Sequence, residues 1–467
     1  MILRDTNDTI IAPATAAGVG AIAVIRVSGK NTFEIVDSVF TSKGKKTKHI
    51  QELSSHTIHL GWIKDGEHVI DEVLISIFKN PNSYTGEDVV EISCHGSTFI
   101  QQQIIQLLVR KGTRNAEAGE FTLRAFMNGK LDLSQAEAVA DLIASDSSAS
   151  HDLALKQMRG GYSSEMKKLR DELINFSSLI ELELDFSEED VEFADRKKLA
   201  ELISRLITHI SNLISSFELG NVIKEGIPVV IAGKPNVGKS TLLNALLNEE
   251  RAIVSHIAGT TRDTIEEEIV LSGIKFRFID TAGLRQTTDA IERIGVSRTM
   301  EKISESPLLV YLFDVTETTS AALIHELDEL KTNLESANFR IILAGNKMDG
   351  HDESSLKKEF AALEDVIFIS AKDKVNINSL TKKLVDSIHL SDLGKDNSIV
   401  TNARHVEALQ NTKDSLENVL SGLNKKLSGD LLSPDIRNAT YHLGLITGEV
   451  TTDMLLENIF SRFCIGK

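Results

Sequence analysis

The chain has 467 residues, of which 25% are charged, and a formal net charge of −17 at pH 7, which excludes a protein that attracts nucleic-acid phosphates over its whole surface. The length is enough for about three globular domains, and no run of about eighteen apolar residues predicts a membrane-spanning helix. Two cysteines, Cys94 and Cys464, exclude a disulfide framework, and with no signal-peptide core at the N-terminus we expect a cytoplasmic protein.

Residues 1–118 have the pattern of an α+β domain. Residues 21–27 form an apolar run, and residues 69–78 and 88–93 alternate between apolar and polar side chains, as sheet strands do. Four lysines gather at positions 43–48, where a solvated loop is the favoured interpretation and an RNA contact is the alternative.

Residues 119–217 have a helical pattern. One predicted helix has an apolar face made of Leu169, Leu173, Phe176, Ile180 and Leu184. An acidic run at 188–190 interrupts the pattern before a further helix begins at Arg196. Helical spacing returns in residues 377–467, with Leu409, Leu416, Leu420 and Leu423 on one face. We therefore expect one helical bundle made of two separated stretches, with another domain, residues 218–376, inserted between them.

Residues 233–240 are the strongest functional signal. They read Gly-Lys-Pro-Asn-Val-Gly-Lys-Ser, the G-x-x-x-x-G-K-S phosphate loop, between an apolar strand at 228–232 and a predicted helix. Backbone N–H groups and a helix N-terminus in this motif cradle phosphates, while the lysine adds charge and the serine hydroxyl binds Mg²⁺. The predicted nucleotide contacts of the loop are Asn236, Val237, Gly238, Lys239, Ser240 and Thr241.

Four further segments follow in the order that a GTPase requires. A loop with Gly259, Thr260 and Thr261 can close on the γ-phosphate and the metal, and Asp280 can hold the Mg²⁺ shell. A carboxylate at Asp349 can accept two hydrogen bonds from guanine that adenine cannot offer, so the sequence predicts GTP. The remaining predicted contacts are Thr281, Ala282 and Gly283 after an alternating strand at 274–278, Asn346 and Lys347 after an apolar strand at 340–344, and Ser370, Ala371 and Lys372 after a strand at 366–369.

Several segments outside the nucleotide domain resemble one protein family. They are residues 83–91 (SYTGEDVVE), 94–96 (CHG), 119–126 (GEFTLRAF), 128–133 (NGKLDL) and 463–467 (FCIGK). With the central GTPase they resemble, over the whole chain, the MnmE (TrmE) family of tRNA uridine-5-carboxymethylaminomethyl modification GTPases. The resemblance implies a multidomain α/β plus α fold: a tetrahydrofolate-binding and dimerisation domain (1–118), a helical domain (119–217 and 377–467), and an inserted Ras-like G domain (218–376).

The resemblance also implies an activity and its partners. Members are K⁺-stimulated GTPases that form homodimers and work in a heterotetramer with an FAD-binding partner, MnmG (GidA). Together they form 5-carboxymethylaminomethyluridine at the wobble position, U34, of certain tRNAs, with a 5-formyl- or methylene-tetrahydrofolate as one-carbon donor. A ribosome-assembly GTPase is the alternative class, but it should carry a G-x-x-G loop or a strongly basic tail, and neither is evident in the sequence.

The G domain lacks one group that Ras-like enzymes use for hydrolysis. Leu284 stands where a glutamine orients the attacking water, so another group must do this work. By the resemblance, Glu292 positions that water, although an exposed helix acid is the alternative. Arg285 is either catalytic or an ordinary loop ion-pair residue. The resemblance assigns K⁺ to Asn236, Ser255, Ile257 and Thr260, assigns Mg²⁺ to Ser240 and Thr261, and adds His256 and Ala258 to the GTP contacts.

A second set of residues matches the folate positions of the family. A pterin needs a carboxylate acceptor and a glutamyl tail needs cations, which Glu91 and the set Arg26, Lys130 and Lys467 would supply. The alternatives are a strand-end ion pair for Arg26 and a surface turn for Lys130. Cys464 is either a reactive thiol at the site or a buried apolar residue.

Overall fold

The computed structural model describes residues 8–44, 49–185, 196–249, 266–280, 308–333, 339–387 and 399–466. The chain divides into two compact units. The first consists of Met1–Ala140, Gln157–Ile207 and Ala408–Lys467, and the second of Asp141–Lys156 and Thr208–Glu407. Within the described ranges, no helix combines the length and the apolarity needed to cross a membrane.

The first unit begins with a mixed sheet whose described strands follow the order β3-β4-β5-β6-β2-β1-β7. One face packs against α1 (Thr32–Asp37) and α2 (Thr98–Arg110) over a core that includes Ile25, Val73, Ile75 and Ile92. The three strands expected from the sequence are confirmed as β2, β5 and β6. The strand bounds are β1 Ile10–Pro13, β2 Ile22–Ser28, β3 Phe40–Ser42, β4 Thr57–Asp65, β5 His68–Phe78, β6 Val89–His95 and β7 Arg114–Asn115.

The opposite face of this sheet carries apolar side chains that no described element covers. Strand alternation places Ile22, Ile58, Leu60 and Leu74 on that face, because Leu60 pairs with Leu74 across β4 and β5, and Leu74 pairs with Ser93 across β5 and β6. These four side chains are 44–67% exposed. An antiparallel sheet has one face on its core and one in solvent, but the solvent face is usually polar. We call this set the open sheet face.

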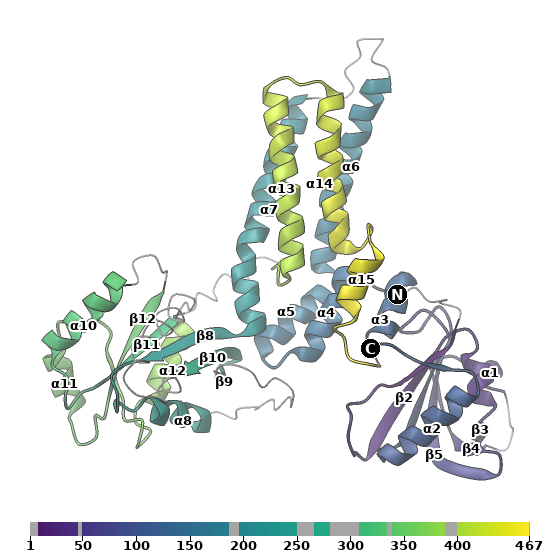
Figure 1. Cartoon of the computed structure of the whole chain (residues 1–467), viewed down its shortest axis with the longest axis horizontal. Coiled ribbons are helices and arrows are strands. Elements are labelled where there is room, and N and C mark those ends of the chain that lie inside the picture. Colours follow the sequence, from purple (N-terminus) through teal and green to yellow (C-terminus); the bar gives the residue numbers. More distant parts are fainter. Residues whose placement is uncertain are drawn as a thin grey trace, which may run out of the picture. The chain divides into compact units, whose positions relative to one another are not determined.

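Helices form the rest of the first unit and extend into the second. The face predicted for α6 is confirmed at Leu169, Leu173 and Ile180, which are buried, and Phe176 is half-buried. Helix α6 packs against α14, which lies more than two hundred residues later, so two separated stretches do form one bundle (Figure 1). The helix bounds are α3 Glu120–Met127, α4 Leu133–Ala144, α5 Ser148–Met158, α6 Gly161–Asp185, α7 Arg196–Glu225, α13 Ala403–Asn424, α14 Gly429–Thr447 and α15 Asp453–Phe460.

The second unit contains a sheet with the order β13-β12-β11-β8-β10-β9, parallel except for β9. Apolar strands that are buried on both faces suit a parallel sheet covered by helices, as in β11, where every residue is buried. The bounds are β8 Ile227–Ala232, β9 Glu266–Leu271, β10 Ile274–Asp280, β11 Leu308–Asp314, β12 Arg340–Asn346 and β13 Ile367–Phe368, with helices α8 Lys239–Glu249, α10 Ser320–Asn333, α11 Glu353–Glu359 and α12 Ile377–Asp386.

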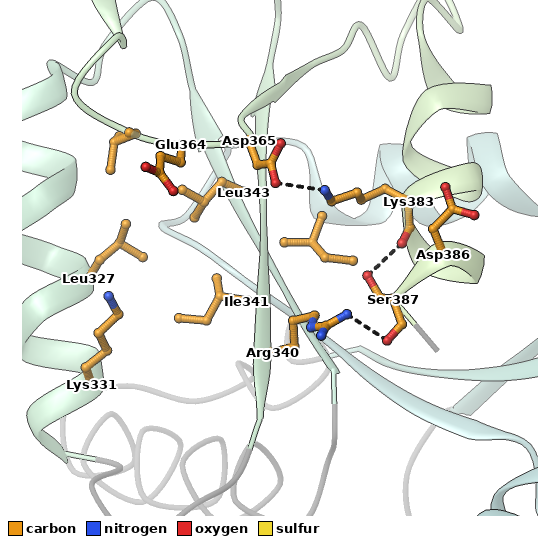
Figure 2. Close-up of a pocket in the computed structure, with 12 residues that line it drawn as sticks. Leu327, Lys331, Arg340, Ile341, Leu343, Glu364, Asp365, Lys383, Asp386 and Ser387 are labelled. Carbon is orange, nitrogen blue, oxygen red and sulfur yellow. Dashed lines mark hydrogen bonds and ion pairs between the residues drawn. The ribbon is translucent and has the colours of Figure 1, made fainter. Parts of the chain in front are cut away.

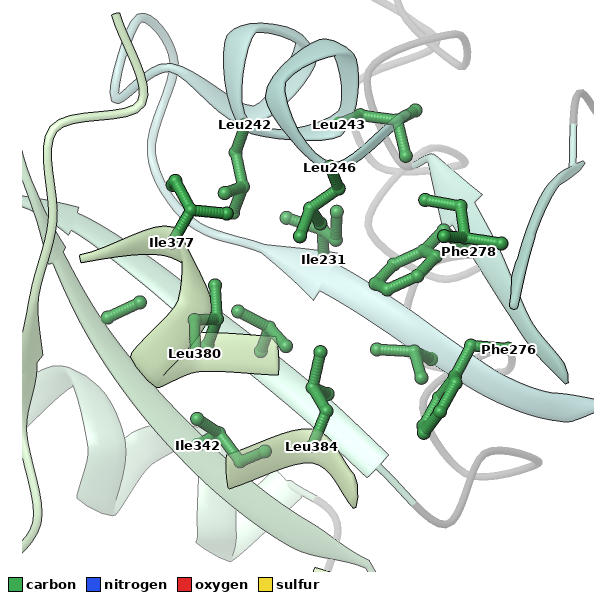
Figure 3. Packing of buried hydrophobic residues seen from close by; sticks show 14 of the residues in the cluster. Ile231, Leu242, Leu243, Leu246, Phe276, Phe278, Ile342, Ile377, Leu380 and Leu384 are labelled. Atoms are coloured by element: carbon green, nitrogen blue, oxygen red, sulfur yellow. The ribbon is translucent and has the colours of Figure 1, made fainter. Parts of the chain in front are cut away.

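The hydrophobic core on one face of this sheet includes residues beyond the expected end of the domain. Leu242 and Leu246 of α8 pack beside Phe276 and Phe278 of β10, and α12 adds Ile377, Leu380 and Leu384 (Figure 3). Helix α12 therefore packs in the α/β core, although the boundary was expected at residue 376. Helix α7 also runs without a break across the expected boundary at 217. The division into three domains at residues 118, 217 and 376 stays a prediction.

Candidate functional site

The predicted nucleotide residues gather at one edge of the second sheet. Strands β8, β10, β11 and β12 run parallel, and the phosphate loop, Asp280 and the segment 346–349 follow the carboxyl ends of three of them. Residues 370–372 follow β13, which pairs in parallel with β12. In open α/β sheets ligands bind at this carboxyl edge. The fold therefore brings together segments that lie up to 139 positions apart, from Gly233 to Lys372.

The phosphate loop has a backbone that requires glycine at two positions. Gly233 has φ +146°, and a Cβ there would lie 2.0 Å from the Leu312 oxygen; Gly238 has φ +99°, and its Cβ would lie 2.3 Å from Asn346 Nδ2. Asn236 has φ +62°, a left-handed conformation that asparagine adopts more readily than most residues. Lys239 Nζ donates to the carbonyl oxygens of Gly233 and Lys234, both at 2.8 Å. The ammonium is thus held within the loop at the N-terminus of α8, where Ser240 and Thr241 are exposed.

Asn346 joins the phosphate loop to the segment 370–372. Its Nδ2 donates to the Val237 oxygen at 2.7 Å, and its Oδ1 accepts from the Ala371 nitrogen at 2.9 Å. Both bonds are buried, and the residue is 3% exposed. Both polar ends of this side chain are therefore used by the protein, so the structure gives Asn346 a positioning role between the two loops that flank the nucleotide.

Asp349 is the exposed carboxylate of the site. Ser370 Oγ donates to its Oδ1, and the same Oγ accepts from the Asp373 nitrogen at 3.1 Å. Ser370 is 1% exposed, so it holds the Asp349 carboxylate from the protein interior and leaves Oδ2 of Asp349 for a ligand. Lys347 has φ +65° and its Nζ lies 2.6 Å from Asp314 Oδ2. Burial would raise the pKa of Asp314, but the hydrogen bonds led by that from Lys347 lower it.

Several predicted residues lie outside the described part of the chain. Those of the second GTPase segment are Ser255, His256, Ile257, Ala258, Gly259, Thr260 and Thr261. Those after β10 are Thr281, Ala282, Gly283, Arg285 and Glu292, with Leu284 among them, and Lys467 follows the last described residue. Of Asp280, only the backbone at the end of β10 is described. The roles assigned to these residues stay predictions.

A cavity of about 530 Å³ lies at the other end of β12 (Figure 2). Arg340, Ile341 and Leu343 line it from the amino-terminal half of that strand, whereas the nucleotide residues follow its carboxyl end. Lys383 Nζ bonds Asp365 Oδ2 at 2.9 Å across its rim. The cavity is therefore separate from the phosphate loop.

A second site in the first unit centres on Arg26 and Glu91. These residues face each other across β2 and β6, and Arg26 Nε donates to Glu91 Oε1 at 2.9 Å. The Arg26 guanidinium lies 5.2 Å from the Tyr84 ring centroid and 5.6 Å from that of Phe121. The pair is only partly exposed, 16% and 26%. Cation–π contacts and a charge-assisted bond thus hold Arg26 in place, and Glu91 keeps acceptor capacity for a ligand.

The end of the described chain packs against the same region. Ile465 forms a bridge with Ala118, and the Gly119 nitrogen donates to the Cys464 oxygen at 3.4 Å. Gly466 has φ +95°, and a Cβ there would lie 2.0 Å from the Pro13 oxygen. Cys464 is exposed, which excludes the interpretation of a buried apolar residue. This tail therefore lies beside the start of α3, the helix that carries Phe121.

Of the two remaining residues named in the sequence analysis of this unit, Lys130 lies at the surface and Cys94 in the core. Lys130 is exposed, and its Nζ donates to the Pro81 oxygen at 2.8 Å. It therefore lies over the loop that carries Tyr84. Cys94 is buried, and burial raises the pKa of its thiol to about 11, so it is not a reactive thiolate at neutral pH.

Three residues that shape these sites had no role in the predictions from sequence. Tyr84 and Phe121 flank Arg26, and Asp314 anchors Lys347. A signal was present for the two aromatic residues, because they fall in the segments 83–91 and 119–126 that carried the family resemblance. Asp314 offered only a carboxylate at the end of an apolar strand.

Comparisons with known proteins cover nearly all of the chain. A family model described as the MnmE helical domain matches residues 133–464, and one described as the N-terminus of the GTP-binding protein TrmE matches residues 9–130. The tRNA modification GTPase MnmE of Cytophaga hutchinsonii is 55% identical over 461 residues, 99% of this chain and 98% of the relative. That of Bacteroides fragilis is 50% identical over 470 residues, 99% and 100% of the two chains.

A solved structure of a variant of Era from Aquifex aeolicus, bound to GDP.AlF4-, is also similar to part of the chain. It is 25% identical, with a TM-score of 0.28 over 40% of this chain and 66% of that one. A likeness this low carries no argument, so the arrangement of strands and loops described above rests on the present structure.

Proposed function

The chain belongs to the MnmE (TrmE) family of tRNA modification GTPases, and from this premise we propose that it hydrolyses GTP in the formation of 5-carboxymethylaminomethyluridine at U34 of certain tRNAs. The single observation that carries the GTPase part is the buried Asn346 link between the phosphate loop and the segment 370–372. It places the phosphate loop, with Lys239, beside the segment in which Ser370 holds Asp349. One nucleotide can then be read at both its phosphates and its base.

The described phosphate loop fits a nucleotide with its cations. The two glycines have positive φ angles that hold the loop in its turn, and Ser240 lies exposed at a helix N-terminus. Ser240 and Thr261 would hold Mg²⁺, and Asn236, Ser255, Ile257 and Thr260 would hold K⁺; when bound, these cations neutralise charge that develops on the phosphates. Asn236 contributes an exposed amide in a loop of fixed backbone. Glu292 would orient the attacking water, since the apolar Leu284 has no group to do so.

The first unit would bind a 5-formyl- or methylene-tetrahydrofolate. Glu91 would accept from the pterin, and the cations Lys130 and Lys467 would pair with the glutamyl tail. Arg26 would also contact the ligand, and its bond to Glu91 and its place beside Tyr84 and Phe121 fix the direction of its guanidinium. It orients the Glu91 carboxylate. Cys464 would belong to the same site, because it is exposed and lies on the C-terminal tail beside the start of α3.

The open sheet face supports the proposed homodimer. Neighbouring exposed apolar residues on a sheet mark an interaction surface, and Leu60 and Leu74, which pair across β4 and β5, are each 44% exposed. A second copy of the chain would bury this face by a two-fold contact. The FAD-binding MnmG would join the dimer in a heterotetramer in the cytoplasm.

The test uses a strain from which the gene is deleted, with the wobble nucleosides of its tRNA measured by mass spectrometry. We expect the modified uridine to disappear and to return with the wild-type gene. Lys239→Ala should abolish both modification and GTP turnover, because it removes the charge held in the phosphate loop. Glu91→Gln and Cys464→Ser should abolish modification and leave GTP turnover near normal.

The surface variant Lys357→Ala is the matched control for Lys239→Ala, because this lysine lies exposed on α11. It should restore modification fully. A deletion strain that keeps the modified uridine would overturn the proposed function. Full modification by Glu91→Gln would overturn the one-carbon site alone.

A further inference from the structure

Helix α3 contacts both Arg26 and the loop that carries Tyr84. Phe121 lies against the Arg26 guanidinium, and Thr122 Oγ1 bonds the Tyr84 hydroxyl at 2.8 Å. Phe121 and Thr122 are both fully buried. Gly119, which precedes the helix, has φ +68°, and a Cβ there would lie 2.6 Å from the Phe460 oxygen, so the helix start is fitted against α15. The placement of α3 therefore sets the surroundings of the Arg26–Glu91 pair.

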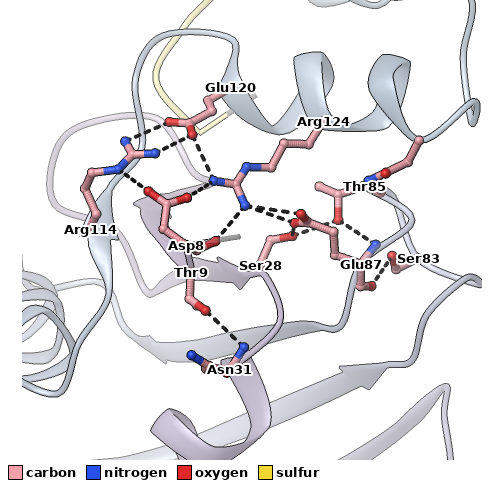
Figure 4. A network of polar contacts seen from close by, with 11 residues as sticks. Asp8, Thr9, Ser28, Asn31, Ser83, Thr85, Glu87, Arg114, Glu120 and Arg124 are labelled. Carbon is pink, nitrogen blue, oxygen red and sulfur yellow. Dashed lines mark hydrogen bonds and ion pairs between the residues drawn. The ribbon is translucent and has the colours of Figure 1, made fainter. Parts of the chain in front are cut away.

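Arg124 is the residue that ties α3 to the loop that carries Tyr84 (Figure 4). Its Nη1 donates to the Asp8 backbone oxygen at 2.8 Å and to Glu87 Oε1 at 3.2 Å, and its Nη2 donates to Glu120 Oε1 at 3.0 Å. The Arg124 side chain is only 4% exposed. A buried guanidinium must be paired on several sides, so each of these carboxylates is held at a fixed distance from α3.

Glu87 passes this constraint to the loop. Its Oε2 accepts from Ser28 Oγ at 2.7 Å, which in turn bonds Thr85 Oγ1 at 2.7 Å. Ser83 Oγ donates to the Glu87 backbone oxygen at 2.6 Å. Residues on both sides of Tyr84 are therefore fixed around Glu87, and Glu87 is fixed by Arg124.

Arg114 belongs to the same charged cluster but has no contact with that loop. It bonds Asp8 Oδ2 at 2.6 Å and Glu120 Oε1 at 2.6 Å. Three carboxylates, Asp8, Glu87 and Glu120, thus share two guanidiniums, and only Arg124 reaches Glu87. Loss of either arginine removes one positive charge from the cluster, but only loss of Arg124 leaves Glu87 without a guanidinium partner.

We propose that Arg124 is a positioning residue of the one-carbon site: by holding Glu87 against α3 it fixes Tyr84 and Phe121 around Arg26, and so directs the Glu91 carboxylate. This inference rests on the proposed function of the Arg26–Glu91 pair. If Arg124 only stabilised the fold, its loss would lower the melting temperature and leave ligand affinity unchanged. As a positioning residue it also affects ligand affinity.

The experiment measures binding of 5-formyltetrahydrofolate to the purified full chain by calorimetry, with the melting temperature of each variant beside it. Arg124→Gln should weaken binding by about tenfold or more, since the Glu91 carboxylate is no longer aimed. Thr122→Val keeps the volume of α3 and removes only the bond to Tyr84. It should weaken binding by roughly threefold to tenfold with little change in melting temperature.

Arg114→Gln is the matched control. It should lower the melting temperature, because it removes a charge from the same cluster, and leave the dissociation constant within about twofold of wild type. If Arg114→Gln and Arg124→Gln weaken binding equally, or if Arg124→Gln binds as the wild type does, the positioning role is wrong. If the wild-type chain itself fails to bind the folate, the proposed one-carbon site is wrong. If Arg124→Gln does not fold, Glu87→Gln decides, because it weakens the same ion pair and leaves Arg124 paired with Asp8 and Glu120; binding as tight as that of the wild type would overturn the proposal.

Discussion

Substitution of Asn346 by alanine should damage the second unit more than the loss of any exposed or half-exposed polar side chain in the nucleotide site. The side chain makes two buried hydrogen bonds, to the Val237 oxygen and from the Ala371 nitrogen. Asn346→Ala leaves both backbone groups without their partner. Each unpaired buried group costs about 1–3 kcal/mol, so we expect the free energy of unfolding of this unit to fall by about 2–6 kcal/mol.

The same loss should appear in nucleotide affinity. In the variant the phosphate loop and the segment 370–372 are no longer linked, so the two can move apart in the free protein. Nucleotide binding must then bring them back together, which costs free energy. A cost of about 1.4 kcal/mol raises the dissociation constant tenfold, and this is only part of the lost stability. We therefore expect GDP and GTP to bind at least about tenfold more weakly.

The assay must report on the second unit itself. The chain has one tryptophan, Trp62, and it lies in β4 of the first unit, so tryptophan fluorescence would follow the wrong part of the molecule. Native-state hydrogen exchange of β8 and β12 amides gives the local stability, and a fluorescent GDP analogue gives the affinity. Asn378→Ala, an exposed asparagine on α12, is the control. Unchanged exchange in β8 together with affinity within about twofold of wild type would refute the link.

The remaining predictions concern hydrolysis, base choice and acid stability. GTP turnover should be faster in KCl than in NaCl, and Asn236→Gly, which keeps the left-handed backbone and removes the amide, should abolish the difference; equal rates for the wild type in both salts would contradict the K⁺ site. Glu292→Ala should lower kcat by about a hundredfold with little change in KM, whereas kcat within about twofold of wild type would make it a surface acid. Asp349→Asn should bind GTP more weakly and accept XTP, and a retained preference for GTP over XTP would count against the guanine assignment. Burial would raise the pKa of Asp8 and Glu120, but hydrogen bonds from Arg114 and Arg124 lower it below the ordinary values of 3.8 and 4.5. The two ionised carboxylates therefore stabilise the first unit above those values, and this stabilisation is lost as the pH falls through the lowered pKa values. The first unit should lose thermal stability below about pH 4.5, and a melting temperature constant down to about pH 3 would contradict this.

Local patterns predicted the elements of the fold well where they are long or strongly periodic. The alternation at Ile274, Phe276 and Phe278 predicted β10, and all three side chains are buried in one core. The strand expected at residues 366–369 is only the two residues of β13, because its pairing is limited to two positions of β12. Helical spacing predicts α12 but does not show which core the helix joins, and the structure has its Ile377, Leu380 and Leu384 in the core of the nucleotide-binding sheet.

The candidate sites could be predicted only as residue types. Nothing in the sequence shows that Arg26 faces Glu91, because this pairing depends on the register of two strands that are 65 residues apart. The same limit applies to Cys464 beside Gly119 and to the double use of Asn346. Motifs identify which side chains matter, and long-range packing decides which of them bind a ligand and which hold another residue.

The division of the first unit into separated stretches has a consequence for its biosynthesis. Residues 208–407 lie between Ile207 and the helices that pack against α6, and Ile465 must reach Ala118. At about 5–20 residues per second, a ribosome needs roughly 10–40 seconds to make that intervening stretch. During this time the nascent first unit lacks α14 and α15, while the second unit can complete its own sheet. The newly made chain should therefore acquire nucleotide binding before it acquires a complete Arg26 site, and chaperones would meet the exposed apolar face of α6 in the interval.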